Sequence, residues 1–242
     1  MMQRLFIVIS VSIATCAFSA DDPALKAAAG EKQLDGAATD KLLAQIAERF
    51  KKSPSIKAKI LTEVDDLVGK RSEEGELLLD RPSRVMRKFT KPSQKIWVLN
   101  ETYIQEYLPN RKTLYTKDFS KAPQTLSLLQ SAVTLDVKAL TGLFNIGVFE
   151  STKENARSYR LLLTPKADTK QPVPYKRIQA RIGETGLFFH EIEYVPESGD
   201  ATVEKYSDIQ AVEKPKEDAF VFEVPQDVKR KTDVIAADAD KK

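Results

Sequence analysis

The stretch GELLLDRPSRVMRKFTKP, residues 75–92, holds two apolar segments of strand length that are separated by an arginine–proline pair. Glu76–Leu79 and Arg84–Phe89 each predict a short strand. Pro82 predicts the turn between them, because proline has no backbone N–H to donate within a sheet. A charged side chain beside this proline, Arg81, is not explained by strand formation alone.

The sequence around this stretch predicts a sheet of many short strands. From Ser55 onward, Ile56, Ala58 and Ile60 alternate with charged residues, which is typical of a half-buried strand. Turn-forming residues separate the later strand candidates. These are Lys95–Leu99, Thr102–Tyr107, Lys112–Tyr115, Tyr159–Leu163, Lys176–Ile182, Leu187–Val195, Ala201–Ile209 and Phe220–Val224. We therefore expect one antiparallel sheet of about 11 strands, with hairpin turns at 183–186 and 196–200.

Two regions break the strand pattern and predict helices. Thr39 can cap a first helix, in which apolar residues recur at spacings of three and four until Pro54 prevents its extension. Pro123 opens a second helical region that extends to about Gly147 and is unusually apolar for a surface connection. The apolar positions are Leu42, Leu43, Ile46, Ala47 and Phe50 in the first region, and Leu126, Leu129, Val133, Val137, Leu140 and Phe144 in the second.

The chain is expected to be exported. Arg4, the apolar run that follows it and the small residues before position 20 predict a signal peptide, residues 1–19. Residues 20–38 predict a flexible arm, residues 39–228 one folded domain, and residues 229–242 a flexible charged tail. An alternative interpretation makes Cys16 the lipidated first residue of a membrane-anchored protein.

The composition removes most enzyme classes. The chain has one histidine, and its one cysteine lies in the predicted leader, so we expect no disulfide, no metal and no cofactor. Fingerprints for nucleotides are absent, and 38 basic against 35 acidic residues do not indicate a nucleic-acid surface. We expect no catalytic residue; the alternative is a hydrolase that uses His190.

The order of the segments resembles the outer-membrane lipoprotein carrier family, LolA, and its relative LolB. The resemblance rests on GELLLDRP, FTKPSQKIWVLNETYIQEYLP, YRLLLTPKA and AFVFEVPQDV, and it extends from Leu42 to Lys231. It implies an α+β fold, a half-open antiparallel β-barrel in which the N-terminal helix and the helical insertion form a lid over an apolar cavity.

The resemblance also implies roles for individual residues. Arg81 matches the arginine that hydrogen-bonds to the lid backbone and keeps the empty cavity closed. Val85 stands where many relatives place an aromatic residue, and Phe89 and Trp97 are the candidates to compensate. The residues expected to form the lid and line the cavity are Leu42, Ile46, Phe50, Leu126, Leu129, Val137, Leu140, Phe144, Phe188 and Ile192, with Phe189 replacing the last two in the opposite register.

The function implied by the resemblance is that of a monomeric periplasmic carrier. Its cargo would be acylated lipoproteins or other lipids, received from an inner-membrane release complex and passed to an outer-membrane acceptor. The alternative is an anchored outer-membrane acceptor, or a general lipid-binding module, lipidated at Cys16.

Overall fold

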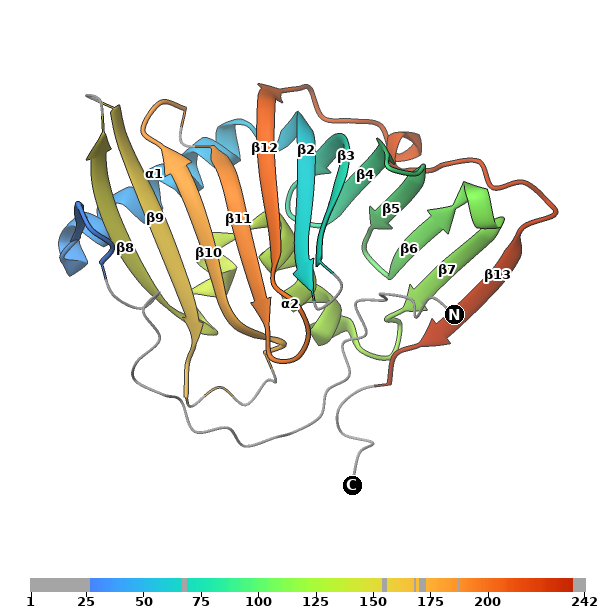
Figure 1. The fold of residues 1–242 in the computed structure, drawn as a ribbon. Coiled ribbons are helices and arrows are strands. Elements are labelled where there is room, and N and C mark those ends of the chain that lie inside the picture. The colour runs from blue at the N-terminus through green and yellow to red at the C-terminus, as the bar shows by residue number, and fades with distance from the viewer. Residues whose placement is uncertain are drawn as a thin grey trace.

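The computed structural model describes residues 27–236, apart from residues 67, 68, 154, 155, 168, 170–172 and 187. The predicted signal peptide, the alternative lipidation at Cys16 and the last residues of the predicted tail lie outside this part of the chain. Three helices and one large sheet make up the described fold, which is the expected half-open barrel with helices on one side (Figure 1).

The sheet has 13 strands, two more than expected. Its strands run in the order β1-β8-β9-β10-β11-β12-β2-β3-β4-β5-β6-β7-β13, and β1 and β13 form its two open edges. The strands from the first half of the chain are β2 (Ser55–Asp66), β3 (Gly69–Asp80), β4 (Arg84–Lys91), β5 (Lys95–Leu99), β6 (Tyr103–Leu108) and β7 (Thr113–Asp118). Those from the second half are β8 (Phe144–Lys153), β9 (Ala156–Pro165), β10 (Tyr175–Gly183), β11 (Phe189–Pro196) and β12 (Thr202–Ala211).

Both predicted hairpins are present, because β10 pairs with β11 and β11 with β12 in antiparallel register. The two halves of the sheet join where β12 pairs with β2. Alternation on β2 follows the prediction: Ile56, Ala58 and Ile60 are buried, whereas Lys57 and Lys59 are exposed. On β3, a side chain at Gly75 would place its Cβ 2.7 Å from the Cα of Phe89, so the strands approach too closely there for any larger residue.

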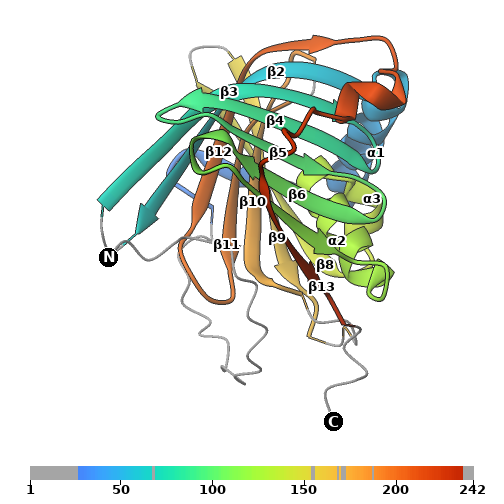
Figure 2. The same ribbon diagram turned by 90° about the vertical axis from the view of Figure 1, so that its right-hand side faces the viewer.

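The three helices lie on the concave side of the sheet (Figure 2). They are α1 (Gly36–Lys52), α2 (Pro123–Thr134) and α3 (Val137–Leu140). Pro123 occupies the first turn of α2 as predicted, and the left-handed backbone of Leu135, with φ of 49°, ends that helix. Asp136 then caps α3 by accepting a hydrogen bond from the backbone N–H of Ala139.

The N-terminal predictions need correction. Asp35 rather than Thr39 caps α1, since its carboxylate accepts a hydrogen bond from the Ala38 N–H at 2.8 Å. The expected flexible arm contains strand β1 (Glu31–Gln33), which pairs with β8. The Glu31 side chain is almost fully buried in an ion pair with Arg160, and this contact fixes the strand to the sheet.

The C-terminal predictions were also partly wrong. The segment Phe220–Val224 is not a strand: a short 3-10 helix, η3 (Glu217–Phe220), leads into irregular chain. Phe220 packs with Met86 and Val98 on the outer face of the sheet. The first part of the expected tail is strand β13 (Lys229–Val234), which pairs in parallel with β7.

Candidate functional site

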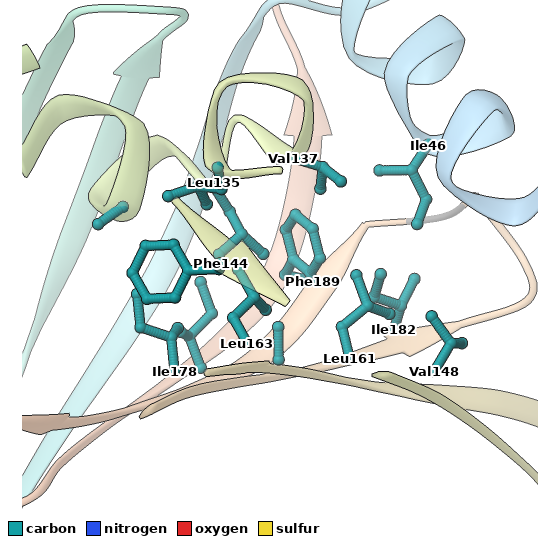
Figure 3. Packing of buried hydrophobic residues seen from close by; sticks show 14 of the residues in the cluster. Ile46, Leu135, Val137, Phe144, Val148, Leu161, Leu163, Ile178, Ile182 and Phe189 are labelled. Atoms are coloured by element: carbon teal, nitrogen blue, oxygen red, sulfur yellow. The ribbon is translucent and has the colours of Figure 1, made fainter. Parts of the chain in front are cut away.

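The concave side of the sheet holds two clusters of buried apolar side chains. The first cluster joins α1 and α3 to β8–β11, and the second joins α2 to β2–β5. Helix α2 lies between them, because its Leu128 belongs to the first cluster and its Leu126 and Leu129 belong to the second. Figure 3 shows how residues of the first cluster, among them Ile46 and Val137 from the helices, point toward the sheet.

Most of the predicted lid residues lie in these clusters. Leu42, Ile46 and Phe50 of α1 and Val137 and Leu140 of α3 are buried in the first cluster. The helical residues thus cover the sheet, as a lid of this kind requires.

The prediction that Phe144 belongs to the helical region is wrong, because Phe144 is the first residue of strand β8. It is nevertheless 1% exposed and packs in the first cluster. The helical spacing from Val137 through Leu140 to Phe144 continued by chance across the end of α3.

An irregularity in the β10–β11 pairing decides which side chains of β11 face the helices. The pairs shift between Arg181 and Ile182, so that Ile182 faces Phe189. Both Phe189 and Ile192 are therefore buried in the first cluster, while His190 is exposed. Phe188 is half-buried and, like Phe189 and Ile192, lines the cavity described next.

A small cavity lies where residues of the two clusters meet. Its volume is about 20 Å³, and Val133 and Thr134 at the end of α2 form part of its wall. Pockets that hold ligands the size of a drug have volumes of roughly 300 Å³ or more. The described helices therefore fill most of the concave side of the sheet and leave no room here for a ligand of that size.

Arg81 lies at this cavity, in the turn between β3 and β4. Its Nε donates a hydrogen bond to the backbone carbonyl of Thr134 at 3.1 Å, and its guanidinium lies 3.8 Å from the centre of the Phe50 ring. It thus contacts both α2 and α1. Burial lowers the pKa of Arg81 to about 10, so the side chain remains charged at neutral pH.

A second polar contact between the lid and the sheet was not predicted. Gln130 of α2 donates from Nε2 to the backbone carbonyl of Asn100 at 2.8 Å, beyond the end of β5. A polar residue within the apolar run SLLQSAV was the available signal, because such a side chain needs a partner when it is buried.

A buried ion pair on the inner wall was also missed by the sequence analysis. Arg87 on β4 contacts Glu204 on β12 through Nη1 and Oε1 at 2.6 Å and through Nη2 and Oε2 at 2.9 Å. Tyr206 donates its hydroxyl to the same carboxylate, and the Trp97 ring lies 4.8 Å from the guanidinium. Strands β2 and β3 lie between the two partners in the sheet, so the pair spans its concave face. Burial alone would lower the pKa of Arg87. The nearby Glu204 and tyrosines raise it, and the resulting pKa lies above the usual value.

His190, the candidate of the hydrolase alternative, lies elsewhere. With Ser151, Ser158 and Arg160 it borders a pocket of about 270 Å³ at the opposite face of the sheet from the lid. Among the described residues, His190 makes no hydrogen bond to either serine, although a nucleophile and its base should lie within hydrogen-bond reach. The serine–histidine arrangement that this alternative requires is thus not formed in the described part of the chain.

Neither a candidate metal site nor a candidate membrane-spanning helix is present among the described residues. No group of three or more histidine, cysteine, aspartate or glutamate side chains in this part of the chain could hold a metal ion. None of the described helices is long and apolar enough to cross a membrane.

Comparison with known proteins identified a family. The family model described as "Outer membrane lipoprotein carrier protein LolA" matches residues 63–223. No curated protein sequence matches the chain.

The solved structures that match the chain have low sequence identity. An uncharacterized conserved protein from Thermus thermophilus is 11% identical, with a TM-score of 0.49 and coverage of 81% of this chain and 99% of its own. A LolA superfamily protein from Nitrosomonas europaea is 12% identical, with a TM-score of 0.39 and coverage of 76% and 97%. LprF from Mycobacterium bovis is 10% identical, with a TM-score of 0.39 and coverage of 75% and 97%.

Proposed function

The chain belongs to the outer-membrane lipoprotein carrier family LolA, and from this premise we propose that it shelters the acyl chains of lipoproteins while they cross the periplasm. The cargo of such a carrier is received from an inner-membrane release complex and delivered to an outer-membrane acceptor. The protein itself binds and releases its cargo as a monomer and catalyses no reaction.

The observation that supports this proposal best is the pair of apolar clusters beneath a closed helical lid. Each methylene group of an acyl chain that leaves water is stabilised by about 0.8 kcal/mol, so a chain of ~16 carbons gains on the order of 12 kcal/mol. Affinity of that size would prevent delivery. In the closed state the lid residues occupy the apolar surface themselves, and this competition lowers the affinity for cargo to a reversible level.

Arg81 is the proposed latch of the closed state. Its hydrogen bond to Thr134 holds the end of α2, and its contact with Phe50 holds α1. Opening the lid would break both contacts and return the guanidinium to water. The cargo must therefore favour the open state by more than the latch favours the closed one.

The proposed location is the periplasm, reached through cleavage of the leader after Ser19. The alternative is a membrane-anchored acceptor or general lipid-binding module of the same fold, lipidated at Cys16. The two differ in the chemistry of the first residue of the mature chain. Native mass spectrometry can therefore distinguish them directly.

The testing experiment expresses the protein with its own leader and analyses the purified protein by native mass spectrometry. We expect an unmodified start near Ala20 and co-purifying lipoprotein or lipid, with more cargo bound to an Arg81→Leu variant. Arg181→Leu, which removes an arginine from a half-exposed ion pair with Glu191, is the matched control and should behave as the wild type. An acylated Cys16 would favour the anchored alternative, and an empty cavity in every variant would contradict the carrier function.

A further inference from the structure

Two arginines border the closed cavity, and each has a buried N–H that no acceptor satisfies. Both Arg81 and Arg87 line this space. Among the described residues, Nη1 of Arg81 and Nε of Arg87 are buried without a hydrogen-bond partner. Buried polar atoms in folded proteins are nearly always paired, so two exceptions at one cavity need an explanation.

No acceptor of the described residues forms a hydrogen bond with either atom. Both oxygens of Glu204 already accept from Arg87, and one of them also accepts from Tyr206. The backbone carbonyl of Thr134 is occupied by Nε of Arg81. The other lining side chains are mainly apolar, among them Ile56, Leu77 and Leu79. The part of the cavity wall that the structure describes thus holds two N–H donors without a formed hydrogen bond.

We infer that the cavity recognises its ligand partly through oxygen acceptors, and that Arg81 Nη1 and Arg87 Nε donate to carbonyl oxygens at the head of an acyl chain. This inference rests on the proposed carrier function and names the chemistry that the cavity selects. The head of a triacylated lipoprotein carries ester and amide carbonyls, whose oxygens accept hydrogen bonds and donate none. A bare hydrocarbon offers no acceptor, so it would leave both N–H groups unpaired.

The geometry of the ion pair supports a role in recognition. Arg87 uses both terminal nitrogens for Glu204, which orients its guanidinium across the concave face and over the Trp97 ring. A guanidinium held in this way presents its Nε in a fixed direction without loss of further side-chain entropy. A buried ion pair is weak evidence for a stabilising role, because apolar residues of similar volume stabilise a fold equally well.

The test compares probes that differ only in their acceptor group. Displacement of a hydrophobic dye is measured with methyl laurate, with N-methyl lauramide, with laurate and with an alkane of equal heavy-atom number. The readout is the ratio of the ester affinity to the alkane affinity. Lid opening lowers the affinity for every probe by the same factor, so this ratio does not depend on the latch.

We expect wild-type protein to prefer the ester to the alkane by about tenfold or more, as one hydrogen bond from a charged donor provides. Arg81→Leu and the double variant Arg87→Met/Glu204→Gln should each lower this ratio several-fold. The glutamine keeps an acceptor for Tyr206, and thermal melting verifies that the double variant folds. The matched control is Arg181→Met/Glu191→Gln, an ion pair that is half-exposed, and it should leave the ratio unchanged.

The outcomes separate this inference from the carrier function. Displacement by all probes with equal affinity would overturn the inference, would indicate that water satisfies the two donors, and would leave the carrier function standing. Failure of every probe to displace the dye would contradict the carrier function itself. A ratio that persists in both arginine variants would also overturn the inference. The affinities for N-methyl lauramide and for laurate show whether the two arginines prefer amide or carboxylate oxygens to ester oxygens.

Discussion

The ion pair between Arg87 and Glu204 allows a stability prediction that can be worked from its geometry. In Arg87→Met, the Glu204 carboxylate remains in a side chain that is 3% exposed, and the Tyr206 hydroxyl is its one remaining described donor. Removing one partner of a buried pair costs about 3–5 kcal/mol, because the other charge remains without compensation. The lost contact with Trp97 adds about 0.5–2 kcal/mol. For a domain of this size we expect the Tm to fall by roughly 10 °C.

The double variant Arg87→Met/Glu204→Gln provides the decisive comparison. Because it removes both charges and keeps an acceptor for Tyr206, we expect its free energy of unfolding to return to within about 1 kcal/mol of the wild type. The coupling energy from the double-mutant cycle should then exceed about 2 kcal/mol. The same cycle on Arg181 and Glu191, which are 45% and 27% exposed, should give less than about 1 kcal/mol.

Urea denaturation followed by tryptophan fluorescence is the suitable assay, because Trp97 is the one tryptophan of the chain and lies beside the guanidinium. The substitution will change the fluorescence of the native state, so the midpoint and slope of the transition carry the result, not its amplitude. A cost below about 1 kcal/mol for Arg87→Met, or a double variant no more stable than the single one, would refute the reasoning.

Three further predictions concern local structure. A hydrogen bond from Arg160 lowers the pKa of Glu31 below its ordinary value of 4.5, so the stabilisation by this ion pair is present above that value and is lost as the pH falls through the lowered folded-state pKa. The Tm advantage of wild type over Glu31→Gln should therefore shrink progressively as the pH falls below 4.5, and a constant difference from pH 7 to pH 3 would contradict this. Gly75→Ala should lower the free energy of unfolding by about 1–3 kcal/mol through a backbone clash, whereas Gly36→Ala, where nothing lies within 4 Å, should not destabilise. Asp35→Ala should cost about 1 kcal/mol and Thr39→Ala only a few tenths, and equal costs in denaturation would show that the cap is wrongly assigned.

Local patterns predicted the central strands well because those strands bury one face. On β2 the alternation of Ile56, Ala58 and Ile60 with lysines gave the strand and its orientation. Strand β13 has no such pattern: Lys229, Arg230 and their neighbours are largely exposed, and the strand exists because the edge of β7 provides backbone partners. A strand that is stabilised mainly by hydrogen bonds to its neighbour does not need an alternating apolar pattern in its own sequence.

The residues of the candidate site also differ in whether the local sequence pointed to them. Arg81 was singled out by the resemblance of the adjacent sequence, and the structure adds its contacts with Thr134 and Phe50, while its role as a latch stays a prediction. Arg87 and Glu204 could not be predicted, because each resembles a solvent-facing residue of a strand and 117 residues separate them. Only the curvature of the sheet across β2 and β3 brings the two side chains together.

The energetics of Arg81 indicate why a buried arginine would suit the proposed latch. Its hydrogen bond to Thr134 and its contact with the Phe50 ring together stabilise the closed state by about 4 kcal/mol. Burial lowers the pKa from 12.5 to about 10, and since each pKa unit corresponds to about 1.4 kcal/mol, confinement of the charge costs roughly 3 kcal/mol. The cost of burying the charge is thus of the same order as the two contacts that favour closure. A leucine in its place would lack both contacts and hold the lid less firmly, whereas the guanidinium regains its hydration when the proposed latch opens. On the proposed function, closure by Arg81 would therefore be weak enough for cargo to reverse it.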